Sequence, residues 1–90
     1  MSAVKRVVLD VLKPHHPNAL EFARAIAEQG PGYRVHLTVV EMDDKTETLV
    51  LEVSAESIDF DGLHATIKAM GASLHSIDEV EVVNDAAVVE

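Results

Sequence analysis

The sequence of 90 residues contains no cysteine and no tryptophan, and it has only three aromatic side chains, Phe22, Tyr33 and Phe60. Without cysteine there is no disulfide framework, no thiolate metal site and no cysteine nucleophile. Because aromatic side chains are so few, the core must be built from valine, leucine, isoleucine and alanine. A chain of this length forms one domain, so we expect a single domain over residues 1–90, with residues 84–90 as a tail or a strand extension.

Long apolar runs are also missing. The stretch that follows Lys5 and Arg6 is interrupted by Asp10 and Lys13. It is therefore too short and too polar for a signal peptide or a membrane span. Together with the lack of cysteine, this favours a cytoplasmic protein without a membrane partner.

Positive charge is scarce as well. The sequence has seven lysines and arginines but sixteen acidic residues, which gives a net charge of −9. Such a surface repels phosphate backbones, and no basic patch is interleaved with aromatic residues, so nucleic acid is excluded as an expected partner. An acidic surface suits cations and a high-salt cytoplasm, where screening weakens self-repulsion. Ordinary solubility is the simpler explanation of the same charge.

The hydrophobic pattern predicts six elements. Residues 4–13 are β-branched and nearly continuously apolar, as in a strand covered on both faces, and residues 33–42 and 48–54 alternate like a hairpin. Apolar residues recur at helical spacing over residues 18–29, and a second helix begins after Asp59, a good N-cap, and ends at Gly71. Residues 72–83 form the last strand, although Ile77 breaks the parity of its apolar residues; a bulge or burial on both faces would explain this.

The order strand, helix, strand, strand, helix, strand predicts an α+β, ferredoxin-like βαββαβ fold. Two helices then pack on one face of a four-stranded antiparallel sheet, and the other face is open. Several apolar side chains remain for the open face, and a contiguous apolar patch there usually marks an interface. We therefore expect a homo-oligomer; scattered surface valines are the alternative. The predicted interface residues are Val8, Leu12, Val40, Val50 and Ile77.

A few polar residues are candidates for chemistry. Asp10 interrupts a strand expected at the centre of the sheet, and a buried carboxylate must be paired, hydrogen-bonded or bound to a cation. His75, Asp78 and Glu79 lie on the last strand, which neighbours the first in this fold. One imidazole with several carboxylates suits a divalent cation such as Ca²⁺ or Mg²⁺. Local pairing of Asp10 and solvation of the other three residues are the alternatives.

Recognised catalytic patterns are missing. The serines lack a GxSxG elbow, and neither GxGxxG nor a Walker A loop occurs. His15 and His16 occupy a turn bracketed by prolines, and protonation of histidines near pH 6 can influence assembly. We therefore expect no enzymatic activity.

Five short blocks resemble an archaeal family of small proteins, domain-of-unknown-function family 211. The resemblance implies compact ferredoxin-like domains that associate into ring-shaped homo-oligomers and have no assigned reaction. The more specific blocks are LDVLKPH and HSIDEV, while His16 and the end of the chain depart from the family pattern. The blocks are LDVLKPH at residues 9–15, LTVVE at 37–41, TET at 46–48, IDF at 58–60 and HSIDEV at 75–80.

Three classes of function follow. The first is a non-enzymatic module that assembles with itself, with a divalent cation as a candidate ligand. The second is a small-molecule regulatory domain of the ACT type, which shares this topology and binds effectors between subunits; this is an analogy from fold alone. The third is an enzyme with its site at a subunit junction.

Overall fold

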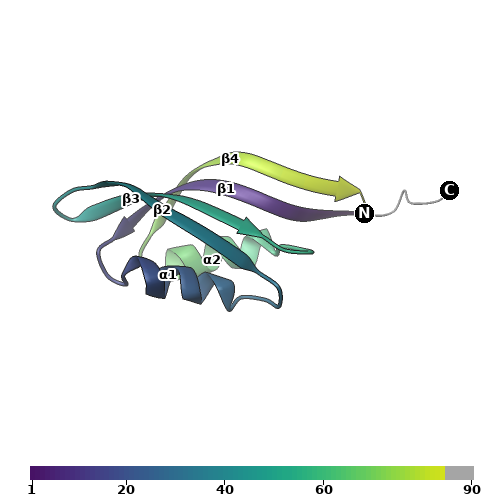
Figure 1. Cartoon of the computed structure of the whole chain (residues 1–90), viewed down its shortest axis with the longest axis horizontal. Coiled ribbons are helices and arrows are strands. Elements are labelled where there is room, and N and C mark those ends of the chain that lie inside the picture. The colour runs from purple at the N-terminus through teal and green to yellow at the C-terminus, as the bar shows by residue number, and fades with distance from the viewer. Residues whose placement is uncertain (85–90) are drawn as a thin grey trace.

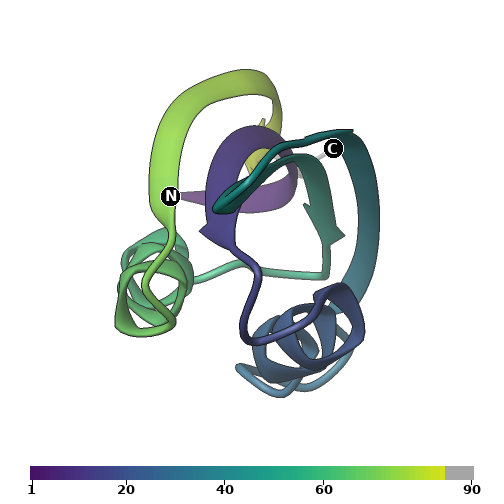
Figure 2. The same ribbon diagram turned by 90° about the vertical axis from the view of Figure 1, so that its left-hand side faces the viewer.

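The computed structural model describes residues 1–84, and the part of the predicted tail beyond residue 84 lies outside them. The sheet has the strand order β2-β3-β1-β4, and each neighbouring pair is antiparallel. Both helices lie on the same side of this sheet (Figures 1 and 2). The predicted α+β, ferredoxin-like fold is confirmed. Its elements are β1 (Ser2–Pro14), α1 (Ala19–Ala27), β2 (Arg34–Met42), β3 (Thr46–Ser54), α2 (Phe60–Ala69) and β4 (Ser73–Asn84).

The core lies between the sheet and the two helices. Alternate residues of a strand face the same side, and partners across a ladder share a face. Val7, Leu9 and Val11 of β1 therefore pack in one layer with their β3 partners, and all six are almost completely buried. The β3 partners are Val53, Leu51 and Leu49. The helices complete the core with Phe22, Ile26, Leu63 and Ile67, none of which is exposed.

Both helices begin where their capping residues stand. Asn18 and Glu21 form a capping box at α1, in which the backbone N–H of Glu21 donates to Asn18 Oδ1 at 2.8 Å. Asp59 caps α2 by accepting a hydrogen bond from the backbone N–H of Gly62 at 3.1 Å. The backbone N–H of Asp59 donates to the hydroxyl of Tyr33 at 2.8 Å. Tyr33 thus joins the start of β2 to the start of α2.

The last strand contains the irregularity that its sequence pattern indicated. The ladder between β1 and β4 shifts register at three places, two of which lie within the stretch that pairs with residues 8–11 of β1. These shifts put Leu74, Ile77 and Val80 in register with residues of β1 that face the helices. Ile77 is opposite Leu9, and it is therefore not in register with Val8 or Leu12 on the open face.

Candidate functional site

Two charged residues continue the buried face of the central strands. Lys13 of β1 and Glu47 of β3 are partners in the ladder, and each stands two residues from a core side chain of its strand. The side chain of Lys13 is completely buried, and that of Glu47 is 9% exposed. An ion pair in such a place must satisfy most of its hydrogen-bonding groups locally, because little water reaches it.

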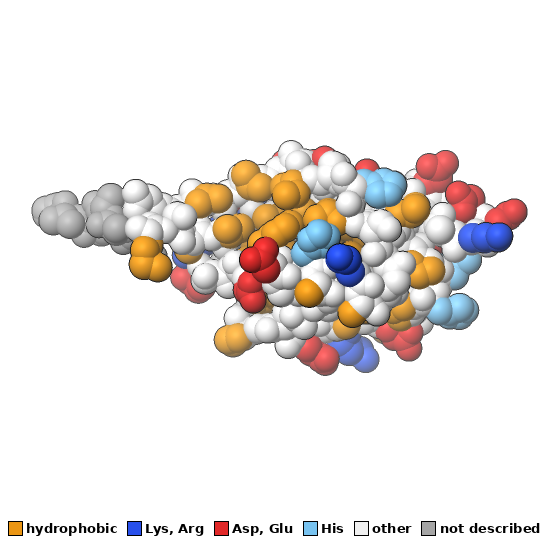
Figure 3. All heavy atoms as spheres, turned by 180° about the vertical axis from the view of Figure 1, so that it is seen from behind, with side chains coloured by type: hydrophobic (Ala, Val, Ile, Leu, Met, Phe, Trp, Pro, Cys, Tyr) orange, Lys and Arg blue, Asp and Glu red, His pale blue; other side chains and the backbone are white. Residues whose placement is uncertain are grey.

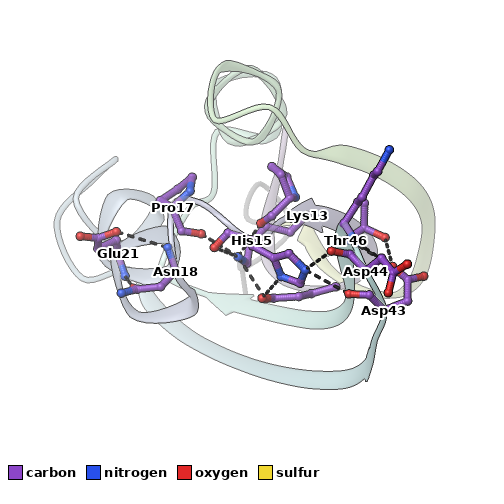
Figure 4. Close-up of polar contacts among 11 residues, drawn as sticks. Lys13, His15, Pro17, Asn18, Glu21, Asp43, Asp44 and Thr46 are labelled. Carbon is purple, nitrogen blue, oxygen red and sulfur yellow. Dashed lines mark hydrogen bonds and ion pairs between the residues drawn. The ribbon is translucent and has the colours of Figure 1, made fainter.

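The ammonium group of Lys13 makes three short contacts with oxygen atoms (Figure 4) and a longer one, of 3.5 Å, with the carbonyl oxygen of His15. Its Nζ lies 3.0 Å from Glu47 Oε1, and it donates to the carbonyl oxygens of Pro14 at 2.8 Å and Pro17 at 2.6 Å. Lys13 therefore holds the turn between β1 and α1 in place around its own side chain. No buried side-chain nitrogen or oxygen within residues 1–84 lacks a hydrogen-bond partner.

His15 adds a third residue to this cluster, which we call the Lys13–His15–Glu47 cluster. Its Nδ1 lies 2.9 Å from Glu47 Oε2, and its Nε2 lies 3.0 and 3.1 Å from the backbone carbonyl oxygens of Asp43 and Asp44. The hydrogen bond to Glu47 raises the pKa of His15 above 6.5. The hydrogen bonds from His15 and Lys13 in turn lower the pKa of Glu47 below 4.5.

The cluster joins two turns that are far apart in the sequence. His15 belongs to the turn after β1, whereas Asp43 and Asp44 form the turn of the β2–β3 hairpin. The pairing of Lys13 with Glu47 was not among the predictions made from the sequence. The available signal was parity, because Lys13 follows Val7, Leu9 and Val11 at even spacing, as Glu47 precedes the buried residues of β3.

The four predicted metal ligands do not form one site. Asp10 lies on a central strand as expected, but it stands on the open face beside Val50 and Ser76 and is partly exposed, so water can solvate it. Asp78 accepts a hydrogen bond from the hydroxyl of Ser76 at 2.7 Å, and His75 is exposed and has no partner in the β1 ladder. Within residues 1–84, no three histidine, aspartate or glutamate side chains gather around a position for a metal ion.

Glu79, the fourth predicted ligand, belongs instead to an ion-pair network on the open face. Arg6 of β1 bonds Glu52 of β3 through Nε at 2.6 Å and Glu79 of β4 through Nη1 at 2.8 Å. The hydrogen bond from Arg6 lowers the pKa of Glu52 below 4.5, and both carboxylates raise the pKa of Arg6 further. Arg6 thus ties together the three strands β3, β1 and β4.

The sequence was compared with known families and proteins. The sequence model of domain-of-unknown-function family 211, described as "Uncharacterized ArCR", matches residues 5–90. The chain belongs to this family. An uncharacterised protein of the archaeon Methanocaldococcus jannaschii is 36% identical to it over 80 residues, which is 89% of this chain and 82% of the relative.

Two of the family 211 blocks meet in the Lys13–His15–Glu47 cluster. Lys13 and His15 belong to LDVLKPH, and Glu47 is the central residue of TET. The fold brings these blocks together because β1 and β3 are neighbouring strands in register.

Neither helix within residues 1–84 has the length and apolar composition needed to cross a membrane.

The predicted interface residues occupy different environments. Val8 is only 9% exposed, and Leu12 and Val50 are half-buried on the open face of the two central strands. Val40 and Ile77 stand on the edge strands and are 55% and 50% exposed. Whether these five residues contact a partner stays a prediction.

Exposed apolar side chains are concentrated on the two edge strands. From the side that carries β4 and α2, hydrophobic side chains gather in one area of the surface (Figure 3). Elsewhere in residues 1–84, the exposed large hydrophobic side chains are Leu20 on α1 and the terminal Met1. The edge-strand residues are Val39, Val40 and Met42 on β2, and Ile77, Val80, Val82 and Val83 on β4.

Proposed function

We propose that this member of family 211 is a non-enzymatic module that assembles with copies of itself through the two edges of its sheet. The observation that carries the proposal is the position of the exposed apolar side chains on β2 and β4. Edge strands present unpaired backbone groups, and soluble monomers usually protect them with charge, proline or a covering segment. A second copy would cover both the backbone edge and the apolar side chains.

The first residues of β1 support the same proposal. β3 pairs with β1 from Arg6 onward, and the backbone N–H groups of Ala55 and Ile58 donate to the carbonyls of Lys5 and Val4. Residues 2 and 3 therefore have only β4 as a neighbour. Figure 1 shows β1 and β4 running together beyond the helices. A two-stranded ribbon is marginally stable in water, and this one exposes Val82 and Val83. Contact with another copy would stabilise it.

The charges of the two edges favour a head-to-tail arrangement. The exposed residues Arg34 and His36 lie near the start of β2, whereas β4 carries the exposed Asp78 and Glu81. Contact between β4 of one copy and the start of β2 of the next brings opposite charges together, but contact between two β4 strands brings carboxylates together. Head-to-tail contacts close into a ring when the rotation between copies permits it.

The non-enzymatic part of the proposal rests on how the clustered acid and base groups are used. Lys13, His15 and Glu47 bond one another and nearby backbone carbonyls. These bonds hold two turns together, and they occupy the groups that an acid–base reaction would need.

The proposal predicts a large change in mass when either edge is altered. Light scattering coupled to size exclusion should give the natural protein a mass several times the 9.7 kDa of one chain. Val80→Lys on β4 and Val40→Lys on β2 should each behave as a single chain, because a lysine on either edge opposes burial of that edge. An equal mixture of the two variants should form a dimer, since each retains the edge that the other lacks.

Leu20→Lys is the matched control, because Leu20 is 63% exposed but lies on α1. It should keep the mass of the natural protein. A natural protein of 9.7 kDa at every concentration and salt level would refute the assembly. Dimers formed by Val40→Lys alone would refute the head-to-tail arrangement. Circular dichroism of each variant establishes that it is folded.

A further inference from the structure

Both ring nitrogens of His15 face oxygen atoms that accept hydrogen bonds. Nδ1 faces the carboxylate of Glu47, and Nε2 faces the backbone carbonyls of Asp43 and Asp44. A neutral imidazole carries a single N–H, so it can donate to only one of these sides. The imidazolium form donates to both. The full set of contacts therefore requires a proton on each nitrogen.

The proton could instead reside on Glu47, but Lys13 opposes this. The ammonium group of Lys13 lies 3.0 Å from the other carboxylate oxygen of Glu47 and stabilises the ionised form. The charged groups around His15 are thus Glu47 on β3, Asp43 in the hairpin turn and Lys13 on β1. The two carboxylates favour the protonated ring, whereas partial burial and the positive charge of Lys13 disfavour it.

The burial of the cluster divides it into a fixed part and a titratable part. Lys13 is completely buried, whereas the side chain of His15 is 33% exposed. Solvent protons can therefore reach His15 while the buried pair stays intact. His15 is also the residue of the cluster that contacts the carbonyls of the hairpin turn.

We propose that His15 is a pH-operated latch, which holds the β2–β3 hairpin turn against the turn after β1 when the ring is protonated. It releases the turn when the ring is neutral, because the single remaining N–H then donates to the charged carboxylate of Glu47 and Nε2 no longer donates to the turn carbonyls. This inference does not depend on how copies of the chain associate. The segment that moves is the hairpin turn at residues 43–45, and the pairing of Lys13 with Glu47 and of Pro14 with Thr46 keeps the strands below it in place.

The direction of the pH dependence follows from the two pKa shifts. The pKa of His15 is raised above 6.5, so the latch is complete below pH 6.5 and is lost as the pH rises through the raised value. The pKa of Glu47 is lowered below 4.5, so its contribution is complete above pH 4.5 and is lost as the pH falls through the lowered value. The latch is therefore tightest between pH 4.5 and 6.5.

Two measurements on the full chain test the latch. In histidine labelled with ¹⁵N, both ring nitrogens of His15 should be protonated at about pH 6, and the titration gives its pKa. Hydrogen exchange, corrected for the intrinsic effect of pH, should show the amides of residues 43–45 losing protection as the pH rises through that pKa. The two results are linked, because each pH unit by which the pKa exceeds 6.5 corresponds to at most about a tenfold loss of protection, since Glu47 also contributes to that shift.

His15→Gln should abolish the pH-dependent step in protection. His16→Gln is the matched control, because His16 is the exposed neighbour in the same turn, and it should retain the step. A His15 pKa at or below 6.5 would overturn the latch, as would equal protection at every pH in the natural protein. The same step in His15→Gln would also overturn it. The pKa of His15 and the hydrogen exchange of the natural protein need no variant, so they remain decisive even if His15→Gln folds poorly.

Discussion

Replacing Lys13 with methionine is expected to lower the free energy of unfolding by about 3–5 kcal/mol. Methionine has nearly the same length, but it cannot donate to the carbonyls of Pro14 and Pro17 or neutralise Glu47. The variant therefore leaves a nearly buried carboxylate with one cation fewer and two carbonyl oxygens without their donor. Domains of this size are stabilised by about 5–15 kcal/mol, so the loss is a large share of the total.

Urea unfolding at a fixed protein concentration measures this loss, because association would otherwise change the apparent stability. Lys5→Met is the control, since the ammonium of Lys5 donates to the carbonyl oxygen of Glu56 at 2.6 Å and pairs with its fully exposed carboxylate at 3.4 Å. An exposed pair contributes about 0–1 kcal/mol. Equal losses in the two lysine variants would contradict the structural role of the buried pair.

Phe22→Ala is expected to lower the free energy of unfolding by about 3–5 kcal/mol, the usual cost of removing a buried aromatic side chain. Only Phe22 and Ile26 of α1 are buried, so Phe22 is one of two side chains that hold this helix on the sheet. Alanine favours helix formation, and the loss therefore arises from the cavity and not from the helix itself.

Leu20→Ala serves as the control for this prediction. Leu20 belongs to the same helix but is 63% exposed, so its replacement should change stability by less than about 0.5 kcal/mol. Urea unfolding of both variants, with circular dichroism to follow the helices, makes the comparison. A cost for Phe22→Ala close to that of Leu20→Ala would mean that α1 is not anchored as described.

Local patterns predicted most of the fold because they act over a few residues. The alternation of β2 and β3, the capping residue Asp59 and the termination at Gly71 were each readable from neighbours in the sequence. β4 was harder, since shifts in register move residues such as Ile77 from one parity to the other. A pattern of period two can indicate that a bulge exists, but it cannot say which β1 residue each side chain will face.

The candidate site could be predicted only in part, because it is made by contacts between distant segments. Lys13 and Glu47 are 34 positions apart, and the sequence around either residue does not identify the other as its partner. Asp10 attracted a metal prediction because it interrupts an apolar strand. Its position on the open face follows from its parity with Val8 and Leu12, but how far water reaches it there depends on the packing of the whole fold.

The hydrogen bond between Tyr33 and Asp59 makes the fluorescence of Tyr33 a probe of the start of α2. Tyr33 is the single tyrosine, and the chain has no tryptophan, so tyrosine fluorescence, excited above the absorption of the two phenylalanines, arises from this one place. The hydroxyl of Tyr33 accepts the backbone N–H at the start of α2. Emission from the natural chain therefore monitors the seating of that helix without any dye or inserted label.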